Sequence, residues 1–468
     1  MEKDKFARKI EAYALKNAIE HKGKARVESV LNALFHEGLK KEQVKDVIEE
    51  IRKQVEKINS LSLEEQKQKF SSLQQEISHR AEREGLPELP NADKGIITRF
   101  APSPSGPLHI GHVATAMPSS LYVKKYGGKF YIRIEDTNPK NIDPKAYEMI
   151  PEEANWLFGN VSEVIIQSDR MEVYYKYAEE LIKKNKAYVC TCDPEKFREL
   201  KKAKKECPCR NLSVEENLER WKKMLDKNGY REGEAVLRFK SDLQLKNPAF
   251  RDFPLARIIE AEHPRQGKKY RVWPLMALGV AVDDMEYGMT HVIRAKEHRD
   301  SAIRQEMIFE AFGKKPPYTF FLGRYKFKDF EISCSKTRKL IEEKKFSGWD
   351  DIRLPFIAAL RKRGYQPEAF AKMAEARGLS EVDKVISKED YFEILDNFNR
   401  EIIKDKAKKI EFSEQKQSGF KEITILMPDA TKKRAFAKIE DIKDGEIVYF
   451  RNFGYARLNG NEFWFCHK

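Results

Sequence analysis

The fold of this chain is decided by one stretch, Arg99-Phe-Ala-Pro-Ser-Pro-Ser-Gly-Pro-Leu-His-Ile-Gly-His112. It follows a predicted buried strand at residues 96–100 and leads into a helix that begins near Leu108. Further strands are predicted at residues 129–134 and 164–166. Because strands and helices alternate at this spacing, the sequence predicts βαβ units and a parallel sheet. Ligands bind such sheets at loops that leave the carboxyl ends of strands, so this stretch is a candidate binding loop.

The residues of this loop suit a ligand that carries phosphate. His109 and His112 are expected in the first turn of the helix, where free backbone N–H groups and the helix dipole already favour phosphate. Gly111 removes a side chain where a base or a phosphate must approach the backbone. One such histidine alone could equally be a helix cap or a core residue. The whole string after a strand favours a nucleotide site.

Outward from this unit, the chain divides into segments of different character. The pattern is helical before the predicted sheet, broken by an insertion within it, helical again after it, and alternating with period two at the end. A stretch rich in turn residues, 85–95, marks the first boundary. The predicted domains are 1–90, 91–186, 187–272, 273–330, 331–405 and 406–468.

The composition restricts the class of protein. Hydrophobic residues make up 41% and charged residues 35%, which excludes a fibrous or wholly disordered chain. The 89 basic and 75 acidic residues leave a net charge of +14, which suits a protein that binds a polyanion. A basic globular protein without a nucleic-acid partner stays open. No apolar run approaches the ~18 residues of a membrane span, and residues 1–13 lack a secretion signal. We therefore expect a cytoplasmic protein that does not bind membranes.

Four of the six cysteines form two close pairs. Cys190 and Cys192 are followed, after fourteen residues, by Cys207 and Cys209. In a cytosolic chain this distribution favours a metal site over a disulfide framework. Four thiolates can complete a tetrahedral Zn²⁺ site with no open position, which would make the ion structural. A set of cysteines without metal is the alternative.

The chain closely resembles the class I aminoacyl-tRNA synthetases, specifically the archaeal type of glutamyl-tRNA synthetase. Residues 109–112, His-Ile-Gly-His, stand as that class's HIGH signature. The resemblance extends over nearly all of the chain, including the segments Ile132-Arg-Ile-Glu-Asp-Thr-Asn-Pro139, Gln167-Ser-Asp-Arg170 and Val292-Ile-Arg-Ala-Lys-Glu297. It implies a multidomain α/β protein with a Rossmann-type catalytic domain, split by a zinc-bearing domain that binds the acceptor stem. A helical N-terminal region, a helical region that contacts the tRNA stem and a C-terminal β-barrel complete the expected fold.

The implied activity is ATP-dependent ligation of L-glutamate to tRNA(Glu) through a glutamyl-adenylate, with Mg²⁺. A substrate with two carboxylates and one ammonium requires cationic partners and an anionic one. Arg99 offers a fork suited to a carboxylate, Glu135 suits the ammonium, Ser103 can donate to a substrate oxygen, and Arg294 adds a positive charge. By similarity these four positions line the amino-acid site and Glu297 lies near ATP. Surface ion pairs are the alternative for each residue alone.

The second signature of this class, KMSKS, is degenerate here. The matching stretch is Glu331-Ile-Ser-Cys-Ser-Lys336-Thr, in which Glu331 and Cys334 stand where the family has lysines. Ser333 and Ser335 match the family and are expected near ATP. Lys336 follows directly and is the candidate for the mobile catalytic cation, with Arg338 in reserve. A helix N-terminus capped at Ser333 or Ser335 is the alternative.

The C-terminal end is shorter than the resemblance implies. Archaeal relatives carry two C-terminal β-barrels, with the second inserted between strands of the first. Only the polar stretch from about 412 to 420 lies between the matching strands here, which is too short for a second barrel. We therefore expect a single, reduced barrel on the anticodon side. A glutaminyl-tRNA synthetase, a tRNA-modifying glutamyl transferase and a non-catalytic tRNA-binding relative remain as alternatives. Whether tRNA(Gln) is also a partner stays open, and no DNA partner is expected.

Overall fold

The computed structural model describes residues 2–21, 23–77 and 85–468, which belong to two compact units divided near residue 83. The described part of the first unit is helical, as the sequence predicts. Its α-helices are α1 (Glu2–Glu20), α2 (Val27–His36), α3 (Val44–Asn59) and α4 (Leu63–Leu73). They enclose a core that includes Ile10, Leu34 and Ile51. The expected capping box at the start of α4 is present, because Ser62 and Glu65 each hydrogen-bond the other's backbone N–H.

A parallel three-stranded sheet begins the second unit. Its strands are β1 (Ile96–Phe100), β2 (Gly128–Ile134) and β3 (Val161–Ile166), in that order. The crossover helices are α5 (Ile110–Tyr126) and α6 (Ala146–Phe158). All three predicted strands are therefore confirmed, and β2 and β3 begin one and three residues earlier than expected.

The chain returns to this sheet with a second parallel pair, β8 (His291–Ala295) and β9 (Tyr318–Leu322). The helices α10 (Met276–Glu286) and α11 (Arg299–Ala311) precede and connect these strands. The N–H of Thr290 donates to the carbonyl of Ile97 at 2.9 Å, which places β8 beside β1. The carboxyl ends of β1, β2 and β8 consequently open toward one site.

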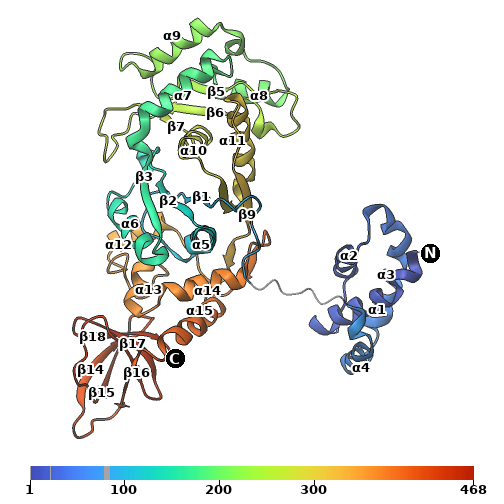
Figure 1. Ribbon diagram of the computed structural model, residues 1–468, viewed down its shortest axis with the longest axis vertical. Coiled ribbons are helices and arrows are strands. Elements are labelled where there is room, and N and C mark those ends of the chain that lie inside the picture. Colours follow the sequence, from blue (N-terminus) through green and yellow to red (C-terminus); the bar gives the residue numbers. More distant parts are fainter. Residues whose placement is uncertain (1, 22, 78–84) are drawn as a thin grey trace. The chain divides into compact units, whose positions relative to one another are not determined.

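Residues between β3 and α10 form an antiparallel sheet at one end of this unit (Figure 1). Its strands are β4 (Ala187–Cys190), β5 (Val236–Phe239), β6 (Pro254–Ile258) and β7 (Val272–Pro274). The accompanying helices are α7 (Met171–Lys183), α8 (Pro194–Lys202) and α9 (Val214–Leu225). Trp221 and Trp273 are buried in the core that joins these elements to α10.

Helices dominate again after β9. They are α12 (Cys334–Glu342), α13 (Ile357–Arg363), α14 (Pro367–Arg377) and α15 (Lys388–Ile403), with a parallel strand pair, β10 (Tyr325–Phe327) and β11 (Lys384–Ile386). The helices α13 and α14 share one core with α5 and the sheet of β1, β2 and β3. This shared core connects the helical segment to the candidate binding loop.

The remaining strands form one sheet at the other end of the unit (Figure 1). They are β12 (Lys408–Ile410), β13 (Phe412–Ser413), β14 (Lys421–Leu426), β15 (Lys432–Ala437), β16 (Ile447–Phe450), β17 (Gly454–Asn459) and β18 (Glu462–His467). Pairing within these described strands leaves β12 and β13 at opposite edges, so we find no closed barrel. Only Glu411 separates β12 from β13, and the sheet must bend until its two edges are adjacent.

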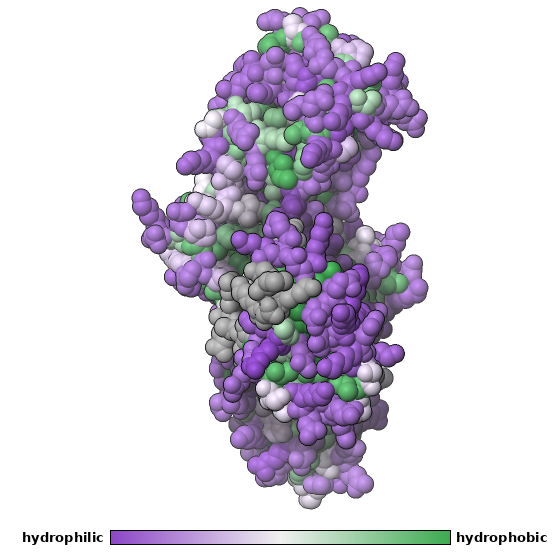
Figure 2. Space-filling view, turned by 90° about the vertical axis from the view of Figure 1, so that its right-hand side faces the viewer, coloured by the Kyte–Doolittle hydropathy of each residue, from purple (hydrophilic) through white to green (hydrophobic). Residues whose placement is uncertain are grey.

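The face of the molecule shown in Figure 2 is mainly polar. On the face shown in Figure 2, apolar side chains form small groups among hydrophilic ones. Among the described helices, none has the length and apolar character needed to cross a membrane.

Candidate active site

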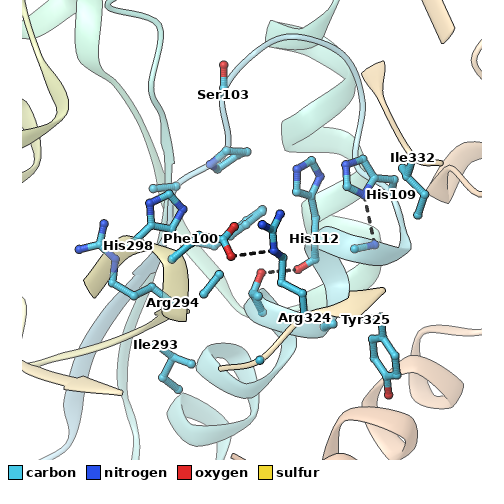
Figure 3. A pocket seen from close by; sticks show the side chains of 18 of the residues that line it. Phe100, Ser103, His109, His112, Ile293, Arg294, His298, Arg324, Tyr325 and Ile332 are labelled. Carbon is cyan, nitrogen blue, oxygen red and sulfur yellow. Dashed lines mark hydrogen bonds and ion pairs between the residues drawn. The ribbon is translucent and has the colours of Figure 1, made fainter. Parts of the chain in front are cut away.

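A pocket of about 820 Å³ lies at the carboxyl ends of β1, β2 and β8. Many of the predicted site residues line it, although they come from distant parts of the sequence: Arg99, Ser103, His109, Gly111, His112, Glu135, Arg294 and Glu297. In Figure 3, His109 and His112 lie on one side of the pocket and Arg294 and His298 on the other. A concave site with convergent polar groups is the geometry of a small-ligand or cofactor site.

The two signature histidines lie against each other at the start of α5. Their ring centroids are 3.7 Å apart and the rings are stacked. The expectation that both lie in the first turn is wrong for His109, which is the N-cap residue and precedes the helix. Its Nδ1 accepts the Gly111 N–H at 3.1 Å, so its proton is on Nε2. A Cβ on Gly111 would lie 3.0 Å from this ring, so the glycine makes room for His109 itself.

Both imidazoles are neutral near pH 7. Burial, with His112 close by, lowers the pKa of His109 well below its usual range. Burial also lowers the pKa of His112 to about 4. The Nδ1 atom of His112 is buried without a hydrogen-bond partner in the described part of the chain. The pair therefore offers ring N–H dipoles, rather than positive charges, to a ligand at the start of α5.

Arg99 lines the pocket and also forms a buried ion pair with Asp284. Its Nε and Nη2 donate to the two carboxylate oxygens of Asp284, each at 3.3 Å, and both side chains are buried. Arg133 is completely buried and donates to the same carboxylate at 2.6 Å, with Glu135 at 3.3 Å. Although burial opposes it, Arg99 and Arg133 lower the pKa of Asp284. Asp284 thus holds the guanidinium of Arg99 in place.

This cluster continues to a second carboxylate. Asp283 accepts from Arg170 at 2.8 Å, from Gln167 at 2.9 Å and from Tyr174. We call the connected set of Arg99, Arg133, Arg170, Glu135, Asp283 and Asp284 the arginine–carboxylate network. Its three cations and three anions balance.

Arg294 adds a positive charge beside the balanced network. It is 8% exposed, and its Nη1 donates to the amide oxygen of Gln305 at 2.8 Å. It forms no ion pair within the residues that the structure describes. Burial and the neighbouring Arg99 lower the pKa of Arg294 to about 10, so it remains charged at neutral pH. A buried cation without an anion is costly, and a bound anion would relieve that cost.

The degenerate signature loop lies at the edge of the pocket. Glu331 and Ile332 line the pocket, whereas Ser333, Ser335 and Lys336 do not. Ser333 is the N-cap of α12, which is the alternative that the sequence left open. Lys336 donates to Glu331 at 2.5 Å, and both side chains are exposed.

Two other cations near the signature loop are already engaged. Arg338 pairs with Asp143 and donates to the carbonyl of Ser105. Arg324 contacts Glu297 at 2.6 Å, and both of these residues line the pocket. Lys336, held only by an exposed glutamate, is consequently the cation of this loop that can move most easily.

The four cysteines come together between β4 and α9. The Sγ atoms of Cys190 and Cys207 are 4.0 Å apart, and those of Cys192 and Cys209 are 3.7 Å apart. A tetrahedral Zn²⁺ with Zn–S bonds of ~2.3 Å requires sulfurs ~3.8 Å apart. Hydrogen bonding from Cys190 lowers the pKa of Cys207 to about 5. Three of the sulfurs, those of Cys190, Cys192 and Cys207, lie within 4.8 Å of one another. Thiolates are ligands that Zn²⁺ prefers, so the chemistry of the four side chains fits this metal, with Cys209 lying outside the closest group of three.

Comparison with known proteins identifies the family. Residues 95–404 match the family described as tRNA synthetases class I (E and Q), catalytic domain. The chain belongs to this class I synthetase family. It is 45% identical over 404 residues to the glutamate–tRNA ligase of Methanothermobacter marburgensis, covering 86% of this chain and 72% of that protein. It is 48% identical over 398 residues to the glutamate–tRNA ligase of Pyrococcus abyssi, covering 83% of this chain and 69% of that protein.

A solved structure gives a weaker match. It is the crystal structure of a glutamate tRNA ligase from Elizabethkingia meningosepticum in complex with its amino acid, with a TM-score of 0.44 and 22% identity. The match covers 66% of this chain and 69% of that one. The resemblance found in the sequence of this synthetase is thus confirmed by the family and by the relatives.

Several residues in or behind the pocket of this synthetase escaped the sequence interpretation. Asp283 and Asp284 end an otherwise apolar run on α10 and are almost completely buried. Since buried carboxylates require partners, this pair was a signal that the sequence contained. Nothing local indicated Arg133 or His298. Burial and the nearby Arg294 lower the pKa of His298 to about 4.

Proposed function

We propose that this synthetase ligates L-glutamate to tRNA(Glu) through a glutamyl-adenylate, with ATP as the energy source. The observation that carries this proposal is the buried positive charge of Arg294 beside a balanced network. L-Glutamate has two carboxylates and one ammonium, so it brings one net negative charge and neutralises the pocket. L-Glutamine has no net charge and would leave Arg294 uncompensated.

The pocket residues supply positions for each group of the substrate. Arg99, whose Nη1 is left free by Asp284, and Arg294 can receive the two carboxylates. Glu135, partly exposed beside Arg133, can receive the ammonium. Ser103 is exposed at the mouth of the pocket and can donate to a substrate oxygen.

The activation step needs no covalent enzyme nucleophile. The α-carboxylate of glutamate attacks the α-phosphorus of ATP, the bond to the bridging oxygen breaks, and pyrophosphate leaves. The start of α5, with Gly111 and the N–H groups of His109 and His112, faces the phosphates and stabilises the charge that develops. Mg²⁺ bound to ATP would neutralise part of the phosphate charge. The terminal ribose hydroxyl of the tRNA then attacks the acyl carbon of the adenylate and loses its proton, the bond to the phosphate oxygen breaks, and AMP leaves.

The signature loop would act on the departing pyrophosphate. Lys336 would leave Glu331 and pair with the β- and γ-phosphates. The hydroxyls of Ser333 and Ser335 would donate to ATP, and Glu297, which now pairs with Arg324, would also lie near ATP. Since the Lys336–Glu331 pair is exposed, it contributes little stability, ~0–1 kcal/mol, and opposes this movement weakly.

The direct test is ATP–pyrophosphate exchange with glutamate or glutamine, with and without tRNA, followed by charging of tRNA(Glu) and tRNA(Gln). We expect exchange with glutamate and transfer to the terminal ribose of tRNA(Glu). Exchange with glutamine instead would indicate a glutaminyl enzyme. Activation without transfer to a tRNA end would indicate a modifying transferase, and no exchange under any condition would indicate a non-catalytic relative.

We further propose that Cys190, Cys192, Cys207 and Cys209 hold one structural Zn²⁺. Three of the sulfurs lie within 4.8 Å of one another, and the fourth, that of Cys209, lies 3.7 Å from the sulfur of Cys192, which supports this proposal. Metal analysis of protein purified without chelators should find about one zinc per chain, and Cys192→Ala should lower this content. Cys466→Ala is the control, because Cys466 is buried far along the chain in β18. Protein without metal under these conditions would contradict the proposal.

The domain assignments are part of the same proposal. Residues 1–90 form the helical N-terminal region. Residues 91–186 and 273–330 form the two halves of the catalytic domain. Residues 187–272 bind the acceptor stem and 331–405 contact the tRNA stem, while 406–468 form the single reduced domain on the anticodon side, whose sheet stays open between β12 and β13. The reaction would take place in the cytoplasm, where tRNA and ATP meet.

A single reduced domain on the anticodon side predicts weak dependence on the anticodon. All described strands after residue 407 belong to one sheet, which limits the surface available for splayed anticodon bases. Substitution of one anticodon base should therefore cost less than the ~1–3 kcal/mol typical of a lost base contact. The check is kcat/KM for charging of tRNA(Glu) transcripts with single anticodon changes, with acceptor-stem changes for comparison. A large loss from one anticodon change would refute the prediction.

A further inference from the structure

A buried carboxyl group lies directly behind the signature histidines. Glu153, on α6, is 5% exposed, and its Oε2 accepts the N–H of Leu108 at 2.6 Å. The N–H of Ala358, in the first turn of α13, lies close enough to this carboxyl to lower its pKa. Glu153 forms no ion pair within the part of the chain that the structure describes. A carboxyl in this position therefore depends on two backbone N–H groups from two different segments.

Those two segments are the ones that hold His109. The N–H of Ile357 donates to the carbonyl of Leu108 at 3.0 Å, and that of Ile110 donates to Pro355 at 3.2 Å. His109 and Phe356 face each other in this short pairing, with ring centroids 5.8 Å apart. Phe356 is the N-cap residue of α13 and has no side-chain oxygen, so the Glu153 carboxyl takes the place of a cap.

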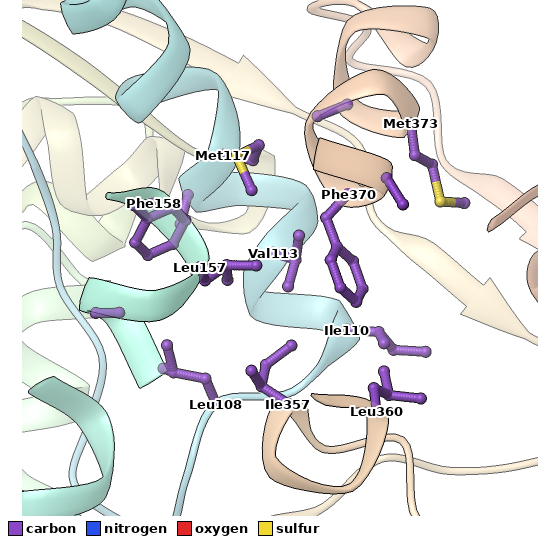
Figure 4. Close-up of a cluster of buried hydrophobic side chains, with 14 of the residues drawn as sticks. Leu108, Ile110, Val113, Met117, Leu157, Phe158, Ile357, Leu360, Phe370 and Met373 are labelled. Carbon is purple, nitrogen blue, oxygen red and sulfur yellow. The ribbon is translucent and has the colours of Figure 1, made fainter. Parts of the chain in front are cut away.

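Glu153 lies on α6 among residues of a large apolar core. Leu108, Ile110, Leu157, Ile357 and Leu360 pack in one core around the start of α5, and Figure 4 shows them converging there. Burial of a carboxyl group in such a core costs free energy unless the carboxyl is hydrogen-bonded. The contacts of Glu153 lead to the residue that precedes His109 and to the helix that covers it.

We propose that Glu153 is a positioning residue for the activation step, because it fixes the backbone before His109 and thereby the stacked pair of His109 and His112. The inference rests on the proposed function, since it concerns the step in which these histidines meet the phosphates. Small displacements of such groups lower the rate of chemistry more than they weaken substrate binding. Glu153 does not touch the substrate pocket, so it acts through His109.

The charge state of Glu153 gives an independent signature. Burial raises the pKa of this carboxyl to about 8; Glu152 also raises it, and Arg361 and the two backbone donors lower it. The Cys334 thiol, in α12, also faces it. In the folded protein Glu153 holds its proton between pH 4.5 and about 8, whereas the unfolded chain releases it. Stability of the wild type should consequently fall as pH rises through this window. Glu153→Gln should remove this part of the pH dependence.

The test compares Glu153→Gln and Glu153→Ala with the wild type and with Glu152→Gln. Glu152 is the adjacent residue, and it pairs with Arg361 at the surface. In ATP–pyrophosphate exchange, Glu153→Ala should lower kcat by about 10- to 100-fold with an unchanged KM for glutamate. Glu153→Gln, which keeps an acceptor oxygen, should recover most of kcat, and Glu152→Gln should match the wild type. In Glu153→Ala, hydrogen exchange at Leu108 and Ala358 should be faster.

Three outcomes would overturn the inference. They are an unchanged kcat in Glu153→Ala, a rise in KM without a fall in kcat, and unchanged hydrogen exchange at both amides. If Glu153→Ala does not fold, Glu153→Asp decides, because its shorter side chain keeps the carboxyl group but withdraws it from Leu108; a wild-type kcat in this variant overturns the inference. If the wild type shows no ATP–pyrophosphate exchange, the proposed function is refuted instead. Amide hydrogen exchange at Leu108 and Ala358 would still test the contacts of Glu153.

Discussion

Replacement of His109 or His112 by alanine is expected to lower glutamate-dependent ATP–pyrophosphate exchange by ~10²-fold or more, the scale for loss of a donor that stabilises developing charge. The two rings stack at the N-terminus of α5, and the hydrogen bond from Gly111 to Nδ1 leaves the Nε2–H of His109 available for a phosphate. Both rings are neutral near pH 7, so the loss reflects missing dipoles and positioning. The measurement is initial rates of exchange at saturating ATP and glutamate.

A capping role must be separated from this chemical role. His109 is the N-cap residue of α5, and the loss of its capping side chain by itself costs about 1 kcal/mol of folding stability. His109→Asn is the matched variant, because asparagine is a strong N-cap residue and lacks the imidazole. We expect this variant to unfold at nearly the wild-type temperature and still to lose exchange. Exchange at the wild-type rate in His109→Asn would show that the histidine acts only as a cap.

The second large effect is expected at Arg294. Arg294→Gln should lower kcat/KM for glutamate by ~30-fold or more, because removal of one partner from a buried charge pair costs ~2–5 kcal/mol. The free protein should not be destabilised, since Arg294 forms no ion pair with any described residue and its burial is itself costly. Steady-state exchange and thermal unfolding of the same preparation measure the two effects together.

Arg299→Gln is the control for this variant. Arg299 begins α11, five residues after Arg294, and its exposed side chain pairs with Glu381. It should exchange like the wild type. An unchanged kcat/KM in Arg294→Gln would remove the main support for glutamate as the substrate, because the charge balance of the pocket would then have no bearing on selection.

The sequence by itself determined the local structure around the signature motif. Residues 96–100 form a strand because a short apolar run is bounded by turn residues, and α4 begins at its capping box because Ser62 and Glu65 are three residues apart. The class of the protein was also readable, through the resemblance of residues 109–112 to the HIGH signature, which the family match confirms. The direction and approximate bounds of β2 and β3 followed from the same periodicity.

Only the tertiary structure decided which charges meet. Arg99, Arg133 and Asp284 are separated by up to 185 residues, and no periodicity indicates that their side chains share a buried site. The same is true of Glu153 and Ala358, and of the bend at Glu411 that brings the edges of the last sheet together. Periodicity reports the environment of a residue along its own helix or strand. The partner of a buried charge depends on how separate elements pack, and desolvation selects that partner only when the fold is complete.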